Sequence, residues 1–200
     1  MNNFIFCNPD KVYFGNNQID KLPAELKKYG SKVLLVYGGG SFKKNGLYDT
    51  VTKLMKENRI EWVELSGVEP NPRHSTVNKG AAICKKENID VILAVGGGST
   101  IDCSKGVAAT AVSATDDVWN LVKKGEMIES GLPIVSILTN AATGSEMDMW
   151  AVISNMVPMR SLLSAVREFF QRLLLKIQKI LFHFRPIRLP VEVLISLITY

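Results

Sequence analysis

The chain of 200 residues lacks a long uncharged apolar run, because no stretch of about 18 or more such residues occurs in it. This argues against a membrane-spanning helix. Its three cysteines, Cys7, Cys84 and Cys103, are too widely spaced for a disulfide framework or a zinc motif, which fits a reducing compartment. The N-terminus lacks the basic segment and apolar run of a secretory signal. A cytoplasmic location is therefore expected.

An excess of basic charge is also absent from most of the chain. The net charge of +5 is carried by residues 157–200, which hold seven Lys or Arg and two Asp or Glu, so residues 1–156 are neutral. A neutral body favours neither nucleic acid nor an anionic membrane as a partner. Residues 157–200 also contain no Gly, Asp, Asn, Trp or Cys, whereas all 15 glycines lie earlier. The composition therefore divides the chain into a body, residues 1–156, and a basic apolar tail, residues 157–200.

Within the body, short apolar runs alternate with segments of helical spacing. The runs are typical of strands buried on both faces, and they lie at residues 33–37, 62–65, 91–95 and 133–138. Apolar residues at helical spacing predict helices over residues 19–29, 47–58, 74–87 and 101–112. Residues 4–6 and 11–15 flank a turn and predict an N-terminal β-hairpin. The alternation predicts an α/β fold with a Rossmann-like parallel sheet.

The glycine-rich turn at residues 96–99 carries the strongest chemical signal. It lies between a buried strand and a helix, where glycines let the backbone approach a diphosphate and the helix N-terminus supplies N–H donors and positive charge. Ser99 and Asp102 have the spacing of a capping box. The turn does not follow the usual G-x-G-x-x-G pattern, and a tight turn without a ligand is the alternative interpretation.

Three further segments follow strands and offer groups to the same ligand. Residues 38–41 contain no acidic side chain to bind a ribose 2′-hydroxyl, so NADP is permitted as well as NAD. Residues 139–146 are rich in hydroxyl groups that suit ribose or nicotinamide. In residues 69–72, Pro72 holds Asn71 extended, and a purely structural loop is the alternative.

Four motifs in this order carry a family resemblance: GGGSFKKNG at residues 38–46, GVEPNPR at 67–73, GGGSTIDCSK at 96–105 and TNAATGSEMD at 139–148. Over residues 1–156 the chain resembles iron-containing (group III) alcohol dehydrogenases, particularly the butanol dehydrogenase branch. The resemblance implies an N-terminal dinucleotide-binding domain followed by an all-helical metal domain. It also implies a homo-oligomer that interconverts small primary alcohols and aldehydes with NADH or NADPH.

The resemblance also implies roles for individual residues. Gly97, Gly98 and Ser99 would hold the pyrophosphate, and Gly39 and Ser41 would lie near the adenosine ribose. Thr139, Asn140 and Thr143 would line the nicotinamide side. Asn71 and Asp102 complete the predicted cofactor-binding set.

The metal chemistry of such enzymes is not expected in this chain. The resemblance implies iron or another divalent metal held by one Asp and three His of the helical domain, where it polarises the alcohol oxygen. The sequence has two histidines, His74 and His183. No metal ligand and no catalytic residue are therefore predicted, and the chain is expected to be a truncated, inactive form. A non-catalytic dinucleotide-binding module is the alternative.

The tail after Met156 no longer follows the family pattern. Its abrupt change of composition suggests a shift of reading frame, a hypothesis that re-reading the DNA beyond codon 156 would test. The alternative is a basic amphipathic helix on an anionic membrane. Its apolar face would comprise Leu162, Val166, Phe169, Leu173, Ile177, Ile180 and Phe184. Without a second domain the body would expose apolar surface, so self-association is expected.

Overall fold

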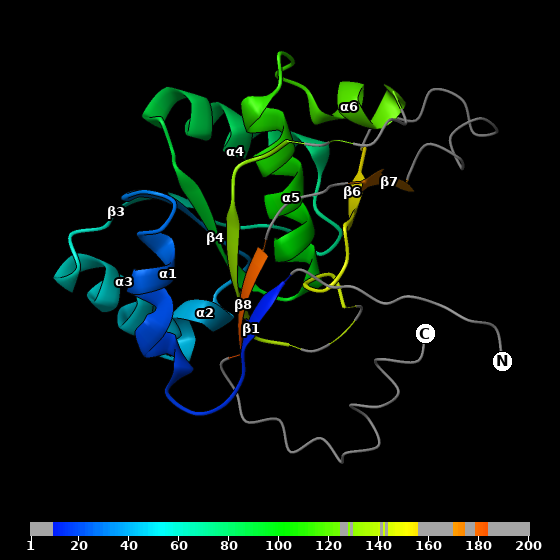
Figure 1. Ribbon diagram of the computed structural model, residues 1–200. Helices are drawn as coiled ribbons and strands as arrows, with labels where there is room; N and C mark the ends of the chain where they lie inside the picture. The colour runs from blue at the N-terminus through cyan, green and yellow to red at the C-terminus, as the bar shows by residue number, and fades with distance from the viewer. Residues whose placement is uncertain are drawn as a thin grey trace, which may run out of the picture.

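The structure is a computed structural model that describes residues 10–124, 128, 130–140, 142, 144–155, 170–174 and 179–183. These residues form a parallel sheet with helices on both faces (Figure 1). The order of the six strands across the sheet is β1-β8-β5-β4-β2-β3. Their bounds are β1 Lys11–Tyr13, β2 Lys32–Tyr37, β3 Glu61–Leu65, β4 Val91–Gly96, β5 Ile134–Leu138 and β8 Lys179–His183. A separate antiparallel pair joins β6, Trp150–Ser154, to β7, Phe170–Leu174.

The central strands are apolar throughout because helices cover both sides of the sheet. On β2, Leu34 and Val36 pack with residues of α4, α5 and α6, while Leu35 and Tyr37 pack with residues of α1 and α3. One face is covered by α4 (His74–Glu87), α5 (Gly98–Val112) and α6 (Val118–Lys124). The other is covered by the short helix η1 (Gln18–Lys21), α1 (Leu22–Leu26), α2 (Ser41–Lys44) and α3 (Leu47–Glu57). The α/β fold predicted from the sequence is confirmed.

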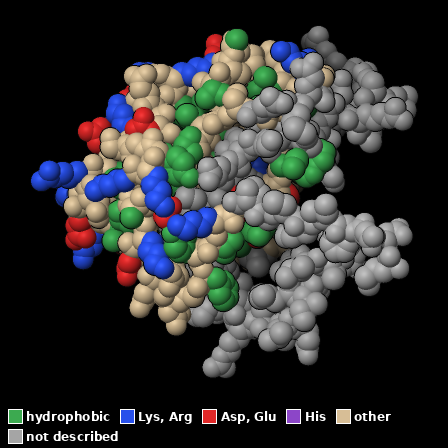
Figure 2. Space-filling model, viewed as in Figure 1, with side chains coloured by type: hydrophobic (Ala, Val, Ile, Leu, Met, Phe, Trp, Pro, Cys, Tyr) green, Lys and Arg blue, Asp and Glu red, His purple; other side chains and the backbone are tan. Residues whose placement is uncertain are grey.

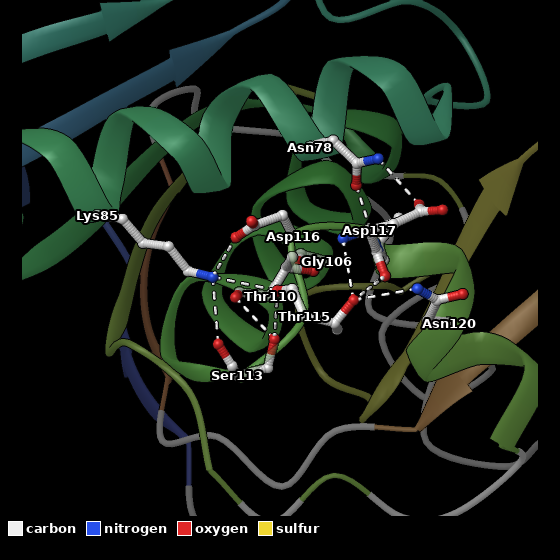
Figure 3. Close-up of polar contacts among 10 residues, drawn as sticks. Asn78, Lys85, Gly106, Thr110, Ser113, Thr115, Asp116, Asp117 and Asn120 are labelled. Carbon is white, nitrogen blue, oxygen red and sulfur yellow. Dashed lines mark hydrogen bonds and ion pairs between the residues drawn. The ribbon is translucent and has the colours of Figure 1, made fainter.

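A polar network anchors the connection between α5 and α6 to α4 (Figure 3). The Asn78 amide donates to Asp117 Oδ1 at 2.9 Å, and its oxygen accepts the Val118 N–H at 2.8 Å. About two turns further along α4, Lys85 Nζ donates to the carbonyl oxygens of Ser113 and Thr115, each at 3.1 Å. Helix α4 therefore holds the C-terminal end of α5, whose N-terminal end lies at the glycine turn.

Most element boundaries lie close to the predicted ones. Helix α4 has the predicted bounds, and strands β2, β4 and β5 differ from them by one residue. The helix expected over residues 19–29 is shorter, since the separate helix η1 comes first and α1 runs only from Leu22 to Leu26, with Pro23 in its first turn. Residues 4–6 of the expected hairpin lie outside the described residues, so the hairpin stays a prediction, and β1 pairs in parallel with β8.

The helix considered for the tail is wrong for residues 170–174 and 179–183, which are strands β7 and β8. Strand β8 lies between β5 and β1, so hydrogen bonds to both neighbours satisfy its backbone. Pairing of this kind depends on the whole fold and can outweigh apolar spacing in a short segment. The other positions of the expected helical face lie outside the described residues.

A buried carboxylate ties β1 to α1. Glu25 is 4% exposed and accepts hydrogen bonds from Lys28 Nζ at 2.6 Å, from Lys11 Nζ at 3.0 Å and from the Tyr13 hydroxyl. Burial by itself raises the pKa of Glu25, but the hydrogen bonds from Lys28, Tyr13 and Lys11 outweigh it and lower the pKa from 4.5 to about 2. The folded chain therefore stabilises the ionised form of Glu25.

Because the pKa of Glu25 is lower in the folded chain than in the unfolded chain, its contribution is complete above about pH 5 and is lost as the pH falls toward 2. Glu25→Gln should lower the free energy of unfolding by about 2–3 kcal/mol at neutral pH and by about half as much near pH 3. Urea unfolding at the two pH values measures both differences. Glu57→Gln is the control, since its pair with Lys53 is exposed. An equal effect of Glu25→Gln at both pH values would contradict the assignment.

Candidate dinucleotide site

Two glycine turns meet at the carboxyl ends of the neighbouring strands β2 and β4. Together with the end of β5 they line a cavity of about 170 Å³. Its walls are formed by Gly38, Gly39, Phe42, Asn45, Val95, Gly96, Gly97, Thr100 and Thr139. Open parallel sheets bind their ligands at this edge, outside the carboxyl ends of the strands. The cavity thus lies where the sequence predicts a ligand.

The N-terminus of α5 borders this cavity. Gly97 is the N-cap in an extended conformation, and no side chain caps the helix. The first N–H groups of a 15-residue helix and the positive end of its dipole therefore lie at the cavity wall. This arrangement suits an anionic group such as a diphosphate.

The capping box predicted for Ser99 and Asp102 is wrong. The helix begins at Gly98 and not after Ser99, so both side chains lie within α5 and make other contacts. Ser99 Oγ accepts the N–H of Asn71 at 3.2 Å, which leaves the hydroxyl hydrogen of Ser99 to donate elsewhere. The extended backbone predicted for Asn71 is wrong, since Asn71 has a left-handed conformation (φ 55°), which asparagine tolerates better than most residues. Its contact with the glycine turn at residues 96–99, called the phosphate turn below, is made by its main-chain N–H.

Asp102 belongs to a buried charged cluster beside the cavity rather than to the cavity wall. It is 6% exposed and accepts the N–H of Val152, on β6, at 3.0 Å. Lys105, which is completely buried, donates to Asp148 Oδ1 at 2.9 Å and to the carbonyl oxygen of Trp150, and lies 3.9 Å from Asp102 Oδ1. Burial raises the pKa of Asp102, against the lowering effect of the Val152 N–H and Lys105. The cluster holds the start of β6 against α5.

Several of the predicted contact residues are brought together. Gly39, Gly97 and Thr139 line the cavity, and the Thr139 N–H donates to the Gly96 carbonyl at 3.0 Å. Asn140 lies close by, because a Cβ built on Gly97 would be 3.8 Å from its Cβ. Gly98 and Ser41 begin α5 and α2 respectively, and Thr143 lies outside the described residues. That these residues contact a cofactor stays a prediction.

The first glycine of each turn, Gly38 and Gly96, was not among the individual residues predicted to contact the cofactor. A Cβ built on Gly96 would lie 2.4 Å from Thr100 Oγ1, and one built on Gly38 would lie 3.3 Å from the Val68 carbonyl oxygen. By contrast, nothing lies within 4 Å of a Cβ built on Gly39. Their positions in the sequence could have identified both glycines, since Gly38 directly follows β2 and Gly96 ends β4. Nothing in the local sequence identifies Phe42 and Asn45 as lining residues.

The described residues do not fit the metal that the family resemblance implies. Among them, no three His, Cys, Asp or Glu side chains lie close enough together to hold a metal ion. His74 is at the start of α4, with its ring 6.3 Å from that of Trp119. Cys84 and Cys103 are buried, and burial raises the pKa of each thiol to about 12, so neither is a ready thiolate ligand.

The face of the molecule drawn in Figure 2 carries charges of both signs. Figure 2 shows Lys and Arg side chains interspersed with Asp and Glu on the face that it presents. Mixed charges of this kind do not create the field of one sign that attracts nucleic acid. In the described part of the chain, no helix combines the length and the apolar character needed to cross a membrane.

Comparisons with known proteins agree with this geometry. The family model for iron-containing alcohol dehydrogenase matches residues 9–166. NADH-dependent butanol dehydrogenase A of Clostridium acetobutylicum is 58% identical over 156 residues, which is 78% of this chain and 40% of that protein. An NADPH-dependent aldehyde reductase of Escherichia coli is 37% identical over 156 residues, 77% of this chain and 40% of that protein.

A solved structure extends the likeness to the fold. The crystal structure of NADH-dependent butanol dehydrogenase A from Thermotoga maritima superposes with a TM-score of 0.81 at 41% identity, and the match covers 96% of this chain and 47% of that one. The chain spans about 40% of the length of the curated relatives named above. By its motifs, its fold and these matches, the chain belongs to the iron-containing alcohol dehydrogenase family.

Proposed function

We propose that the chain binds NADH or NADPH in the cavity between its two glycine turns, as the nucleotide-binding part of an oxidoreductase for primary alcohols and aldehydes. The observation that carries the proposal is the meeting of Gly39, Gly97 and Thr139 at the N-terminus of α5. Relatives named for NADH-dependent and NADPH-dependent activities support both forms of the cofactor. Butanol and butyraldehyde are the substrates suggested by the relative from Clostridium acetobutylicum.

The geometry supports one orientation of the cofactor. The diphosphate would lie at the first turn of α5, where main-chain N–H groups and the Ser99 hydroxyl can donate to it. The adenosine ribose would extend toward Gly39 at the end of β2, and the nicotinamide toward Thr139 at the end of β5. These two strands lie on opposite sides of β4, so a dinucleotide would cross the sheet edge over the phosphate turn.

We also propose that this chain binds the cofactor without turning over an alcohol. Hydride transfer is chemistry of the nicotinamide, but the protein must orient the substrate and stabilise the charge on its oxygen. The described residues provide no metal cluster for that task. Binding without turnover is therefore expected, in contrast to the activity for which the relatives are named.

Fluorescence titration with NADH and NADPH tests the proposal. Saturable binding in the range of about 1–100 μM is expected. Ser99→Ala should weaken binding about tenfold, because it removes a donor to a charged phosphate. Ser75→Ala, an exposed position on α4, is the matched control and should leave the affinity unchanged.

The same preparation, verified by mass, would be assayed with butanol and butyraldehyde in the presence of added Fe²⁺. No turnover is expected. A folded chain that binds neither dinucleotide would refute the proposed binding site. Metal-dependent oxidation of butanol would refute only the proposed lack of turnover.

A further inference from the structure

A charged aromatic cluster lies beside the cavity, at the edge of the sheet formed by β3. We call it the Glu64 cluster, and it consists of Tyr37, Lys43, Tyr48 and Glu64. Tyr37 is the last residue of β2, Lys43 is in α2, Tyr48 is in α3 and Glu64 is in β3. The described contacts give this cluster no role in the proposed binding of a diphosphate.

Glu64 is held as a carboxylate by its neighbours. The Tyr48 hydroxyl donates to Glu64 Oε1 at 2.6 Å, and the Tyr37 hydroxyl donates to Oε2. Burial by itself raises the pKa of Glu64, but the hydrogen bonds from Tyr37 and Tyr48, together with the charge of Lys43, lower it below 4.5. Glu64 therefore carries a full negative charge at neutral pH.

Lys43 is drawn toward this carboxylate. Its Nζ lies 3.9 Å from Glu64 Oε2, 4.7 Å from the ring centroid of Tyr48 and 5.4 Å from that of Tyr37. The carboxylate and the two ring faces all attract an ammonium group. Lys43 does not line the cavity, although Phe42 before it and Asn45 after it do.

One ring connects the cluster to the cavity. Phe42 lines the cavity and packs against Tyr37 and Tyr48, with ring centroids 5.1 and 5.5 Å apart. The turn that precedes it, residues 38–41, has no acidic side chain. The charge near this end of the cavity is therefore set by the lysines of α2 and by whatever neutralises them.

We propose that Glu64 determines cofactor specificity by holding Lys43 away from the ribose 2′ position, which favours NADH over NADPH. This inference rests on the proposed function, because it places the adenosine ribose at the end of β2. NADPH differs from NADH by a 2′-phosphate, and a released lysine in α2 would attract that phosphate. The Glu64 carboxylate both occupies the ammonium group and adds a charge that repels phosphate.

Glu64→Gln tests the inference, because glutamine removes the charge, keeps an acceptor oxygen for one tyrosine and has an NH2 group that can donate to the hydroxyl oxygen of the other. The affinity for NADPH should rise about fivefold relative to that for NADH, and the affinity for NADH should stay the same. Adding Lys43→Met to Glu64→Gln should cancel the gain. Glu61→Gln, at the opposite end of β3, is the matched control and should leave the ratio unchanged.

The ratio of the two affinities separates specificity from stability, since a structural loss would weaken both cofactors alike. An unchanged ratio in folded Glu64→Gln would overturn the inference while leaving the proposed function intact. Lys43→Met alone provides a second test, because it leaves the Glu64 carboxylate without its paired ammonium group, so the affinity for NADPH should stay the same or fall relative to that for NADH. If that single variant raises the affinity for NADPH relative to NADH, the inference is wrong. A wild-type chain that binds neither cofactor would overturn the proposed function and this inference together.

Discussion

Replacing Lys105 by methionine should lower the free energy of unfolding by about 3–5 kcal/mol, the usual cost of leaving a buried charge without its partner, because the buried Asp102 carboxylate would lose its counter-charge. The Lys105 side chain is fully buried, and its ammonium group joins Asp148 and the Trp150 carbonyl to α5. Methionine has a similar length but cannot donate a hydrogen bond. Asp102 is only 6% exposed, and it would then lack the nearest positive charge described for it. Urea unfolding measures the loss.

Two further variants make the Lys105 prediction specific. Lys85→Met removes another lysine that joins helices, but its side chain is 32% exposed and the aspartate paired with it is 90% exposed, so a loss of about 1 kcal/mol or less is expected. Adding Asp102→Asn to Lys105→Met should recover part of the stability, because it removes a buried carboxylate that has lost its counter-charge. A loss for Lys105→Met no greater than that for Lys85→Met would show that the buried cluster does not hold β6 in place.

The fold could be predicted where periodicity was strong and local. Residues 33–37 and 91–95 are apolar at every position, and they are the centre of a sheet covered on both faces. Helix α4 has apolar residues on one side and a left-handed C-cap at Asn88, which gives it clear ends. Strand β8 could not be predicted, because its conformation depends on pairing with β1 and β5, which lie far away in the sequence.

The candidate site, like the fold, could be predicted from the sequence only in part. The glycine turns at residues 38–41 and 96–99 were identifiable because each follows a buried strand, and such positions converge at one edge of a parallel sheet. The contact between Asn71 and Ser99 could not be foreseen, since it is made by a main-chain N–H in a left-handed conformation. The pair of Lys105 and Asp148 joins residues 43 positions apart and has no local signal.

Two clusters of charged side chains hold together elements that border the cavity. Lys105 and Asp102 tie α5 to β6 on one side of the phosphate turn, whereas the Glu64 cluster ties α2 and α3 to β3 on the other. Neither cluster lines the cavity, yet each is attached to a helix that does: the first to α5, through Thr100, and the second to α2, through Phe42. Variants of the two groups should therefore differ in kind: loss of Lys105 acts on stability, and loss of the Glu64 charge acts on the choice of cofactor.

Gly96→Ala should weaken NADH binding by about 50-fold or more and lower the free energy of unfolding by about 2–3 kcal/mol. The new Cβ would lie 2.4 Å from Thr100 Oγ1 and 2.8 Å from Thr100 Cβ, and Thr100 is 5% exposed in the first turn of α5. Because rotation of the Thr100 side chain cannot move its Cβ, the start of α5 must move. The N–H groups proposed to bind the diphosphate would move with it. Thermal unfolding and NADH titration measure the two effects.

Gly97→Ala separates these two effects. Gly97 has a φ of −94°, which alanine adopts without strain, and its Cβ would meet only the Asn140 Cβ, at an ordinary contact distance of 3.8 Å. Stability should therefore change by about 0.5 kcal/mol or less. The added methyl group would still stand at the cavity wall and keep a diphosphate from approaching the backbone, so the NADH affinity should fall about tenfold. If Gly97→Ala instead lost stability and kept its affinity for NADH, Gly97 would be needed for the fold rather than for the cofactor.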